Sequence, residues 1–263
     1  MMAPVHSPSP SLVVSIVSHG HGSCVQALLT AICKYSAGIV TRVVLTLNVP
    51  EPEPQVPLSG WPFVLDVKHN LVPLGFSANH NNALRNAREQ FVCVLNPDIQ
   101  FATADPFAPL VEIAALPGVG CSYPEQVDRS GRLQDFEREL PSPWALLRRR
   151  MLHRQESRVD WVSGACMVFS SRVWGALGGF DERYFLYCED VDLCLRLRLA
   201  GLKLAKAPAS IVHAGQRASG RNAQHLLWHV RSLFRLWRSP AYRRAQELRG
   251  AQAVMITGTI DAP

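Results

Sequence analysis

Five carboxylates crowd one short stretch of an otherwise basic chain of 263 residues with a formal charge of +6. They are Asp181, Glu182, Glu189, Asp190 and Asp192. Neighbouring carboxylates raise one another's pKa, and desolvation by aromatic neighbours such as Phe185 and Tyr187 acts in the same direction. One carboxylate in such a cluster can therefore be tuned to accept a proton as a general base.

The same residues also have a purely structural interpretation. Glu189, Asp190 and Asp192 lie where the first turn of a helix over Val191 to Ala200 is expected to begin. Acidic groups at that position complement the helix dipole whether or not they do chemistry. The local sequence leaves both interpretations open.

Composition favours one large α/β domain, because 48% of the residues are hydrophobic and 18% are charged. The chain has no apolar run of about 18 residues, and its first residues lack the features of a signal peptide. We therefore expect a cytoplasmic protein. Its seven cysteines include no Cys-x-x-Cys pair, so zinc and redox sites are not expected.

Arginines supply most of the positive charge and gather at 148–150 and again between 231 and 244. Such clusters suit an anionic partner, which could be nucleic acid, an acidic membrane surface or a phosphorylated substrate. A solvated basic surface without any partner explains them equally well. No basic motif interleaved with aromatic residues is present, so we expect no nucleic-acid partner.

Strands and helices are expected to alternate in the first half of the chain. This alternation implies a parallel sheet with right-handed crossovers, whose ligands collect at the carboxyl ends of the strands. Strands are expected at 12–17, 42–47, 63–67 and 91–95, and helices between 23 and 38 and from 75 onward.

The second half is less regular and shows no internal repeat and no second domain. Helices are expected at 106–115, 191–200 and 226–237, strands at 119–123, 159–169, 202–205 and 210–213, and a basic amphipathic stretch at 143–153.

Six short motifs occur in a fixed order along the chain. They are Gly75-Phe76 with Asn81, Leu95-Asn-Pro-Asp98, Asp160-Trp-Val-Ser-Gly164-Ala165, Gly178-Gly-Phe-Asp181-Glu182, Glu189-Asp-Val-Asp192, and Val212-His213-Ala-Gly215 with Ser219. Together they resemble the inverting family-two glycosyltransferases, particularly rhamnosyltransferase-like members that act on bacterial surface polysaccharides. The resemblance extends from about residue 12 to residue 219.

The resemblance implies the GT-A fold, a single Rossmann-like α/β/α sandwich with a mostly parallel central sheet. The expected boundaries are a flexible tail at 1–11, a glycosyltransferase domain at 12–240 and a C-terminal tail at 241–263. Within the domain, a donor-binding half at about 12–100 precedes an acceptor and catalytic half at about 101–240.

Asp98 is similar to the family residue that holds a divalent cation on the donor diphosphate. Asn96 fills the first place of the same Asp-x-Asp-like motif, and His213 is the second candidate ligand. The hard cations Mg²⁺ and Mn²⁺ suit a carboxylate together with phosphate oxygens. From the residues alone, Asn-Pro-Asp also suits a β-turn, and a lone histidine at a strand end also suits a polar rim.

Asp190 resembles the catalytic base of the family, and Glu189 is expected to position the acceptor or the base. Trp161, Gly164 and Ala165 resemble the segment that lines the sugar pocket, where glycine permits close approach and tryptophan offers a stacking face. Tryptophan in a buried strand could equally be core. Asp181 is assigned to the same acceptor side, where it helps to organise the loop.

The resemblance also implies a set of residues around the nucleotide sugar. They are Ser18, His19, Asn48, Asn70, Gly75, Asn81, Asn96 and Asp98. Many family members carry an acidic residue after the second strand that reads the uracil or thymine edge, but Leu47 stands there in this chain. Asn48 could make a neutral hydrogen bond instead, so the choice between UDP and dTDP donors is open.

The expected function is a metal-dependent inverting transfer from a UDP- or dTDP-linked sugar, rhamnose among them. The acceptor would be a bacterial cell-surface glycan or a lipid-linked acceptor at the inner face of the cell membrane, with the basic C-terminal helices contacting anionic lipid. The alternative is a donor-binding or complex-forming subunit of a glycan assembly system that has lost the chemistry.

Overall fold

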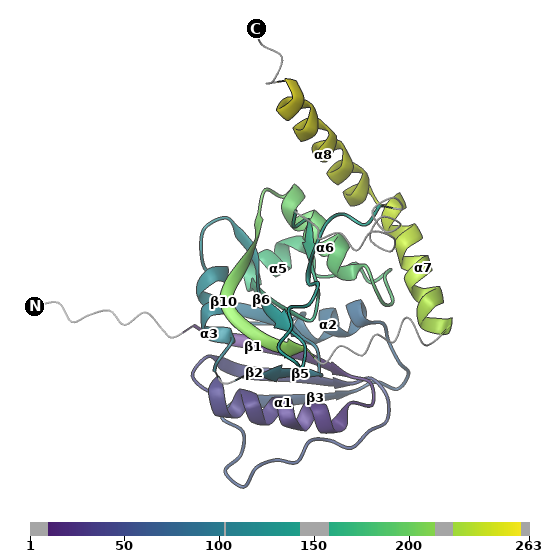
Figure 1. The fold of residues 1–263 in the computed structure, drawn as a ribbon. Helices are drawn as coiled ribbons and strands as arrows, with labels where there is room; N and C mark the ends of the chain where they lie inside the picture. The colour runs from purple at the N-terminus through teal and green to yellow at the C-terminus, as the bar shows by residue number, and fades with distance from the viewer. Residues whose placement is uncertain (1–9, 103, 143–157, 214–222, 259–263) are drawn as a thin grey trace, which may run out of the picture.

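The central feature of the fold is an eight-stranded sheet with helices on both faces (Figure 1). The computed structural model describes residues 10–102, 104–142, 158–213 and 223–258. In the sheet the strands follow the order β3-β2-β1-β4-β9-β6-β10-β5. These are β1 (Leu12–Ser18), β2 (Val40–Leu47), β3 (Val64–His69), β4 (Phe91–Leu95), β5 (Ile99–Phe101), β6 (Val119–Val127), β9 (Cys166–Ser170) and β10 (Lys203–His213).

Strands β3, β2, β1 and β4 are parallel to one another, as are β6 and β10. Strand β9 runs antiparallel between β4 and β6, and β5 runs antiparallel beside β10. A second, two-stranded sheet pairs β7 (Glu137–Arg138) with β8 (Trp161–Val162). The predicted mostly parallel sheet is confirmed.

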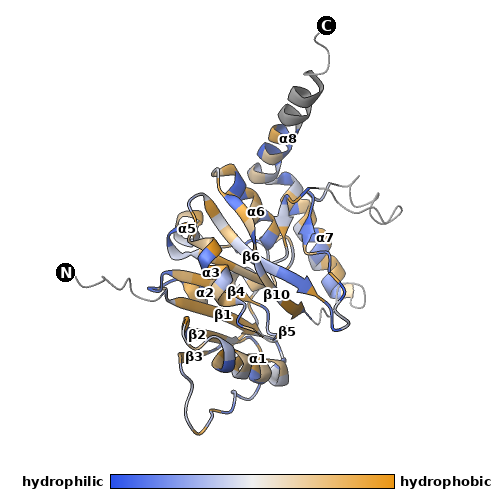
Figure 2. Cartoon of the chain, turned by 60° about the vertical axis from the view of Figure 1, so that its left-hand side comes forward, coloured by the Kyte–Doolittle hydropathy of each residue, from blue (hydrophilic) through white to orange (hydrophobic). Residues whose placement is uncertain are grey.

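The helices bury the sheet from both sides. Helices α1 (Gly22–Tyr35) and α3 (Phe107–Ala114) cover one face, and α2 (Phe76–Leu84), α5 (Ser171–Leu177) and α6 (Glu189–Leu199) cover the other. Because both faces are covered, the central strands are apolar along their length, as the orange colouring of β1 and β2 in Figure 2 shows. The predicted α/β/α sandwich is therefore confirmed.

Two expected elements differ from the structure at informative places. The single strand expected at 159–169 is two strands, β8 and β9, separated by residues 163–165. The two short strands expected at 202–205 and 210–213 are joined in β10, whose pairing with β6 is irregular between Lys206 and Ser210. The basic stretch expected at 143–153 lies outside the described residues.

The C-terminal segment forms helices α7 (Ala223–Arg238) and α8 (Pro240–Gly258), which pack beside α6. The boundary expected at residue 241 falls within α8, which begins at Pro240, and Tyr242 is only 3% exposed. Tyr242 belongs to a third apolar cluster with Leu236 of α7 and Leu195 of α6. None of the helices in the described ranges is long and apolar enough to cross a membrane.

A buried ionic cluster around Asp160 joins α6 and α8 to the segment before β8. Its carboxylate lies 2.7 Å from Arg198, 3.0 Å from Arg158 and 3.3 Å from Arg249, and it accepts a hydrogen bond from the Leu140 N–H. Burial by itself raises the pKa of Asp160, but the Leu140 N–H and the arginines outweigh it, so the net pKa is lowered.

Replacing Asp160 with alanine is expected to lower the free energy of unfolding by about 3–5 kcal/mol, because three guanidinium groups lose a buried partner. Urea denaturation measures the change. The matched control is Asp66→Ala, which breaks a more exposed pair with Arg42 and should cost at most about 1 kcal/mol. Since the folded pKa of Asp160 is lowered, its stabilising effect is complete above about pH 4 and disappears as the pH falls further. Equal losses in the two variants would contradict the prediction.

Candidate active site

Four loops follow the carboxyl ends of β1, β2, β3 and β4 and meet at one edge of the sheet. The parallel register aligns Ser18 with Leu47, and Leu47 with His69, so these strands end side by side. Ligands of open α/β sheets collect at this edge. Apart from Asn81, which lies within α2, the predicted donor-binding residues lie in or next to these loops.

Asp98 and His213, the two predicted metal ligands, are neighbours in the structure. His213 is the last residue of β10 and pairs with Ile99 of β5, the residue after Asp98. This register brings His213 Nε2 to 3.5 Å from Asp98 Oδ1, with both side chains about 15% exposed. A ligand could therefore reach both groups.

The surroundings of Asp98 keep its carboxylate ionised. Burial raises the pKa, but the hydrogen bond and charge of His213, with a smaller effect of His21, outweigh it and lower the pKa. A carboxylate oxygen and an imidazole nitrogen are donors that Mn²⁺ accepts, so the pair fits a divalent cation. Within the described ranges, no group of three His, Cys, Asp or Glu residues could hold a metal ion.

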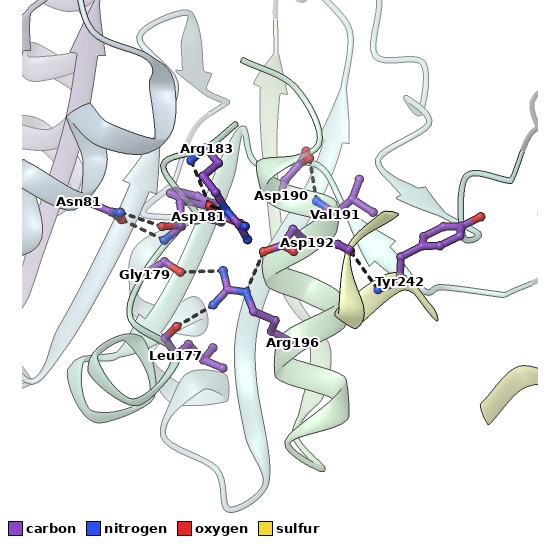
Figure 3. A network of polar contacts seen from close by, with 12 residues as sticks. Asn81, Leu177, Gly179, Asp181, Arg183, Asp190, Val191, Asp192, Arg196 and Tyr242 are labelled. Atoms are coloured by element: carbon purple, nitrogen blue, oxygen red, sulfur yellow. Dashed lines mark hydrogen bonds and ion pairs between the residues drawn. The ribbon is translucent and has the colours of Figure 1, made fainter. Parts of the chain in front are cut away.

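Asp190 lies in the first turn of α6 and is half-buried against the loop between β8 and β9. Its Oδ2 accepts a hydrogen bond from the Gly164 N–H at 3.1 Å. Its Oδ1 accepts one from the Val191 N–H at 2.8 Å, which Figure 3 shows. A Cβ on Gly164 would lie 3.3 Å from the Asp190 Cβ, so glycine allows this close approach. Burial raises the pKa of Asp190 although both N–H groups oppose it.

The chain enters α6 through two left-handed residues that are not glycine. Tyr187 has a φ of 72° and Cys188 a φ of 67°. Each such residue costs on the order of 1 kcal/mol, and strain of this kind concentrates at functional sites. The turn aims the first residues of α6 at the Gly164 loop, which is what places Asp190.

Three of the other carboxylates in the acidic stretch are held by neighbouring side chains (Figure 3). Asp192 pairs with Arg196 at 2.7 Å, and Asp181 pairs with Arg183 at 2.6 Å. Glu182 accepts a hydrogen bond from the Asn81 amide. The expected role of Asp181 in organising its loop agrees with these contacts.

Glu189 is only 6% exposed, and its Oε2 has no hydrogen-bond partner in the described part of the chain. Burial and the charge of Asp190 raise its pKa well above the ordinary value for glutamate. Burial thus favours the neutral form of the Glu189 carboxyl, whereas Asp190 accepts two backbone hydrogen bonds that favour its ionised form.

Arg196 is a supporting residue that the sequence interpretation missed. Besides pairing with Asp192, it donates hydrogen bonds to the Leu177 carbonyl at 2.6 Å and the Gly179 carbonyl at 2.8 Å. It thereby ties α6 to the end of α5. The spacing of four residues from Asp192 was the signal that could have found it.

From the sequence, the Asn48 side chain is expected to be able to bind a nucleobase. The structure differs, because Asn48 is 6% exposed and its side chain makes hydrogen bonds inside the protein. Its Oδ1 accepts hydrogen bonds from Asn70 Nδ2 at 2.7 Å, Leu74 N at 2.9 Å and Asn79 Nδ2 at 3.1 Å. Asn48 and Asn70 therefore shape the loop before α2, with Asn79 as a member that the sequence did not single out. Exposed His19 contacts the Asn48 amide at 3.2 Å.

Three other residues expected at the donor are engaged in internal contacts. Ser18 is fully buried and accepts a hydrogen bond from the His21 N–H. Asn81 holds the backbone N–H and carbonyl of Phe180. A Cβ on Gly75 would lie 2.6 Å from the Phe185 carbonyl oxygen, so this glycine allows α2 to pack on the acidic loop.

Two of the residues expected in the sugar pocket, Ala165 and Trp161, also make contacts inside the protein. Ala165 is 1% exposed and its methyl group belongs to the core, so it does not line a pocket. Its carbonyl instead accepts a 2.8 Å hydrogen bond from the Asn96 N–H, which ties the loop to the end of β4. Trp161 donates to the Glu139 carbonyl, and the Arg138 guanidinium lies 5.4 Å from its ring.

Comparison with known proteins agrees with this geometry. The family model described as "Glycosyltransferase like family 2" matches residues 147–253. Rhamnosyltransferase WbbL of Escherichia coli (strain K12) is 30% identical over 184 residues, which cover 61% of this chain and 69% of that protein. The chain belongs to glycosyltransferase family 2. The resemblance drawn from the six motifs is thereby confirmed.

A longer match covers most of both chains. N-acetylglucosaminyl-diphospho-decaprenol L-rhamnosyltransferase of Mycobacterium tuberculosis is 27% identical over 258 residues, 85% of this chain and 82% of that protein. Both relatives are named as rhamnosyltransferases.

Solved structures share the fold of this family-2 glycosyltransferase. Mannosyltransferase PcManGT from Pyrobaculum calidifontis, solved with GDP-Man and Mn²⁺, has a TM-score of 0.60 at 18% identity and covers 95% of this chain and 79% of its own. GalNAc-T7, solved with UDP, GalNAc and Mn²⁺, has a TM-score of 0.57 at 15% identity, with coverages of 77% and 43%. The expected GT-A fold is confirmed.

Proposed function

We propose that this glycosyltransferase is an inverting, metal-dependent enzyme that transfers rhamnose or a related hexose from a UDP- or dTDP-linked donor to a sugar on a lipid diphosphate. One observation carries the proposal. Two hydrogen bonds connect the proposed base with the turn that carries the proposed metal ligand Asp98. The Gly164 N–H donates to Asp190, and the Ala165 carbonyl accepts from the Asn96 N–H. Residues 163–165 thus hold Asp190 and the Asp98 turn in a fixed relation.

Asp190 is the proposed base. It would take the proton of the acceptor hydroxyl while that oxygen forms its bond to the anomeric carbon and the bond to the donor diphosphate breaks. A single displacement of this kind inverts the anomeric configuration. The buried Glu189 carboxyl, whose pKa is raised by burial and by the charge of Asp190, would support the position of α6.

Asp98 and His213 are the proposed ligands of Mg²⁺ or Mn²⁺, with Asn96 completing the turn that presents Asp98. When bound, the cation would stabilise the charge of the leaving diphosphate. The remaining ligands would come from diphosphate oxygens and water, which suits a site with two protein ligands. The Mn²⁺ in the titles of the mannosyltransferase and GalNAc-T7 structures supports this assignment.

The acceptor class rests on the mycobacterial relative, whose name specifies an N-acetylglucosaminyl-diphospho-lipid. We propose the same chemical class for this chain. The donor loops would come from the half at about 12–100 and the acceptor side from the half at about 101–240. Because Asn48 is engaged internally, the loop of residues 70–74 that it shapes would contact the base in place of the Asn48 amide.

The experiment that tests the proposal combines the purified chain, Mn²⁺ and a panel of nucleotide sugars with a sugar-diphosphoryl-lipid acceptor. Release of nucleoside diphosphate and formation of a glycosylated lipid are expected with a UDP- or dTDP-linked donor. Nuclear magnetic resonance of the product is expected to show an inverted anomeric centre. A retained configuration would refute the mechanism, and a complete lack of turnover with all donors would refute the activity.

The competing function is a donor-binding or complex-forming subunit without chemistry, which the internal engagement of Asn48 favours. It predicts donor binding without release of nucleoside diphosphate under any condition. Slow, Mn²⁺-dependent hydrolysis of a donor by the chain alone, lost in Asp190→Asn, would exclude it.

The pH dependence of transfer offers a further prediction. Because burial raises the pKa of Asp190, the apparent acid limb of kcat/KM is expected above the ordinary aspartate pKa of about 3.9. Transfer should therefore fall as the pH drops through this raised value, since the base becomes protonated. The control is Glu189→Gln, which imitates the protonated glutamate and should keep the limb in place. An acid limb at or below pH 3.9 would contradict the assignment.

A further inference from the structure

A groove of about 860 Å³ lies between α7 and the loop that precedes α6. Arg183 and Phe185 of the loop line one side, and Trp228, Arg231 and Arg235 of α7 line the other. None of these residues was assigned a role in the reaction. The groove therefore needs an explanation of its own.

Helix α7 is held firmly against this loop. Ser232 Oγ donates a 2.8 Å hydrogen bond to the Leu186 carbonyl, and Tyr187 Oη lies 2.9 Å from His225 Nδ1. The rings of Phe185 and Trp228 are 5.0 Å apart. The loop continues through Cys188 into the first turn of α6, which carries the proposed base Asp190.

Three arginines of α7 lie on one side of the helix. Arg231, Arg235 and Arg238 are spaced by four and three residues, and all three are exposed. In the part of the chain that the structure describes, no carboxylate lies within ion-pair distance of them, and Arg238 instead stacks on Phe234 at 5.7 Å. Guanidinium groups in this arrangement suit the oxygens of a phosphate or diphosphate.

An apolar stripe runs along α7 beside these arginines. Leu227 is 52% exposed, Val230 is 39% exposed and Phe234 is 50% exposed, at positions that share one face of the helix. An exposed apolar surface next to a cationic groove indicates a ligand with a charged head and a hydrocarbon chain. The ligand chemistry is that of an amphiphilic diphosphate.

We propose that the groove binds the diphosphate of the lipid-linked acceptor, with the first hydrocarbon units along the stripe of Leu227, Val230 and Phe234. This inference rests on the proposed function and adds the place where the acceptor is held. The diphosphate in the groove would direct the acceptor sugar along the loop toward Asp190. The concave shape of the groove, with the α7 arginines along one side, favours a discrete headgroup over the flat surface of a membrane.

Direct binding tests the groove without requiring turnover. Farnesyl diphosphate is the probe, and quenching of Trp228 fluorescence is the signal, with Trp228→Phe as the check that the signal comes from the groove. We expect the double variant Arg231→Gln and Arg235→Gln to weaken binding at least ~10-fold, because both guanidinium groups would lose charge-assisted hydrogen bonds to the diphosphate oxygens. The matched control is Arg243→Gln with Arg244→Gln, two exposed arginines of α8 outside the groove.

Farnesol and inorganic diphosphate separate the contributions of tail and head, and each should bind more weakly than the complete probe. Equal weakening in both double variants would overturn the proposal, as would failure of the wild-type chain to bind the probe. The double variant Arg231→Gln with Arg235→Gln is also tested for sedimentation with phosphatidylglycerol vesicles. If it no longer sediments with the vesicles but still binds the probe as the wild type does, the surface contacts a membrane and the proposal is overturned.

Transfer kinetics separate this proposal from the proposed function. With a sugar-diphosphoryl-prenyl acceptor, the groove variant is expected to raise KM at least ~10-fold with little change in kcat. With an uncharged octyl glycoside of the same sugar, wild type and variant should behave alike. Equal effects on both acceptors would refute the groove. Specific probe binding in a chain that transfers no sugar would support the groove and refute the proposed function.

Discussion

Asp190→Asn is expected to lower kcat for transfer by about 10²–10⁴ while leaving donor affinity within about twofold of wild type. An asparagine has the size of the aspartate but cannot accept the proton of the acceptor hydroxyl. It keeps an oxygen for the Val191 N–H, so the first turn of α6 should stay in place. Single-turnover transfer and calorimetric titration of the donor measure the two quantities separately.

The adjacent carboxyl provides the control for this experiment. Glu189→Gln changes a buried group whose pKa is already raised well above the ordinary value, so the variant resembles the protonated wild type. We expect it to keep transfer within about tenfold of wild type. The roles of the two residues would have to be exchanged if Glu189→Gln were inactive and Asp190→Asn active.

The acidic stretch shows why two interpretations of one sequence can both be right. α6 begins at Glu189, and Asp192 fits the structural interpretation through its pair with Arg196. The same helix start places Asp190 against Gly164, which the structural interpretation did not require. Spacing alone predicted the helix, whereas the choice among the carboxylates depends on residues far away in the sequence.

Local sequence patterns were enough to predict the fold. Parallel strands that helices cover on both faces are apolar throughout, and the covering helices are amphipathic. The proximity of Asp98 and His213 could also be predicted from the sequence. Each residue ends or follows a strand, and register aligns the strands of one sheet. The family resemblance named both residues before the pairing of β10 with β5 was known.

The orientations of side chains were less accessible than the positions of elements. Asn48 follows β2 as expected, yet three hydrogen bonds within the protein engage its oxygen. Ala165 was expected in a segment that lines the sugar pocket, but its side chain is buried in the core and its carbonyl accepts a hydrogen bond from the Asn96 N–H. Such details depend on contacts between residues 20 to 70 positions apart, which no local pattern contains.

The split of the strand expected at 159–169 has the same origin. Periodicity favours one continuous strand there, but the Gly164 N–H binds Asp190 and the Ala165 carbonyl binds the Asn96 N–H. These backbone groups are therefore removed from strand pairing. A local departure from regular structure marks the point where the two sides of the site are joined.

Asp98→Ala is expected to abolish the metal dependence of donor binding and to lower transfer by at least ~100-fold. The variant removes the ionised carboxylate beside His213, and stabilisation of a leaving diphosphate by a cation is worth several kcal/mol. Calorimetric titration of the donor at increasing Mn²⁺ measures the coupling. In the wild type the affinity should rise with Mn²⁺, and in the variant it should not.

His213→Gln separates the contribution of the second proposed ligand, because Asp98 remains to hold the cation. A smaller loss is expected, with an increased Mn²⁺ requirement and a maximal rate that recovers at high Mn²⁺. Asp66→Ala, on β3 and away from this pair, should leave both titrations unchanged. Undiminished metal dependence in Asp98→Ala would show that the cation is held elsewhere. It would then follow that the pairing of β10 with β5 serves the sheet alone, and that His213 lowers the pKa of Asp98 without sharing a ligand with it.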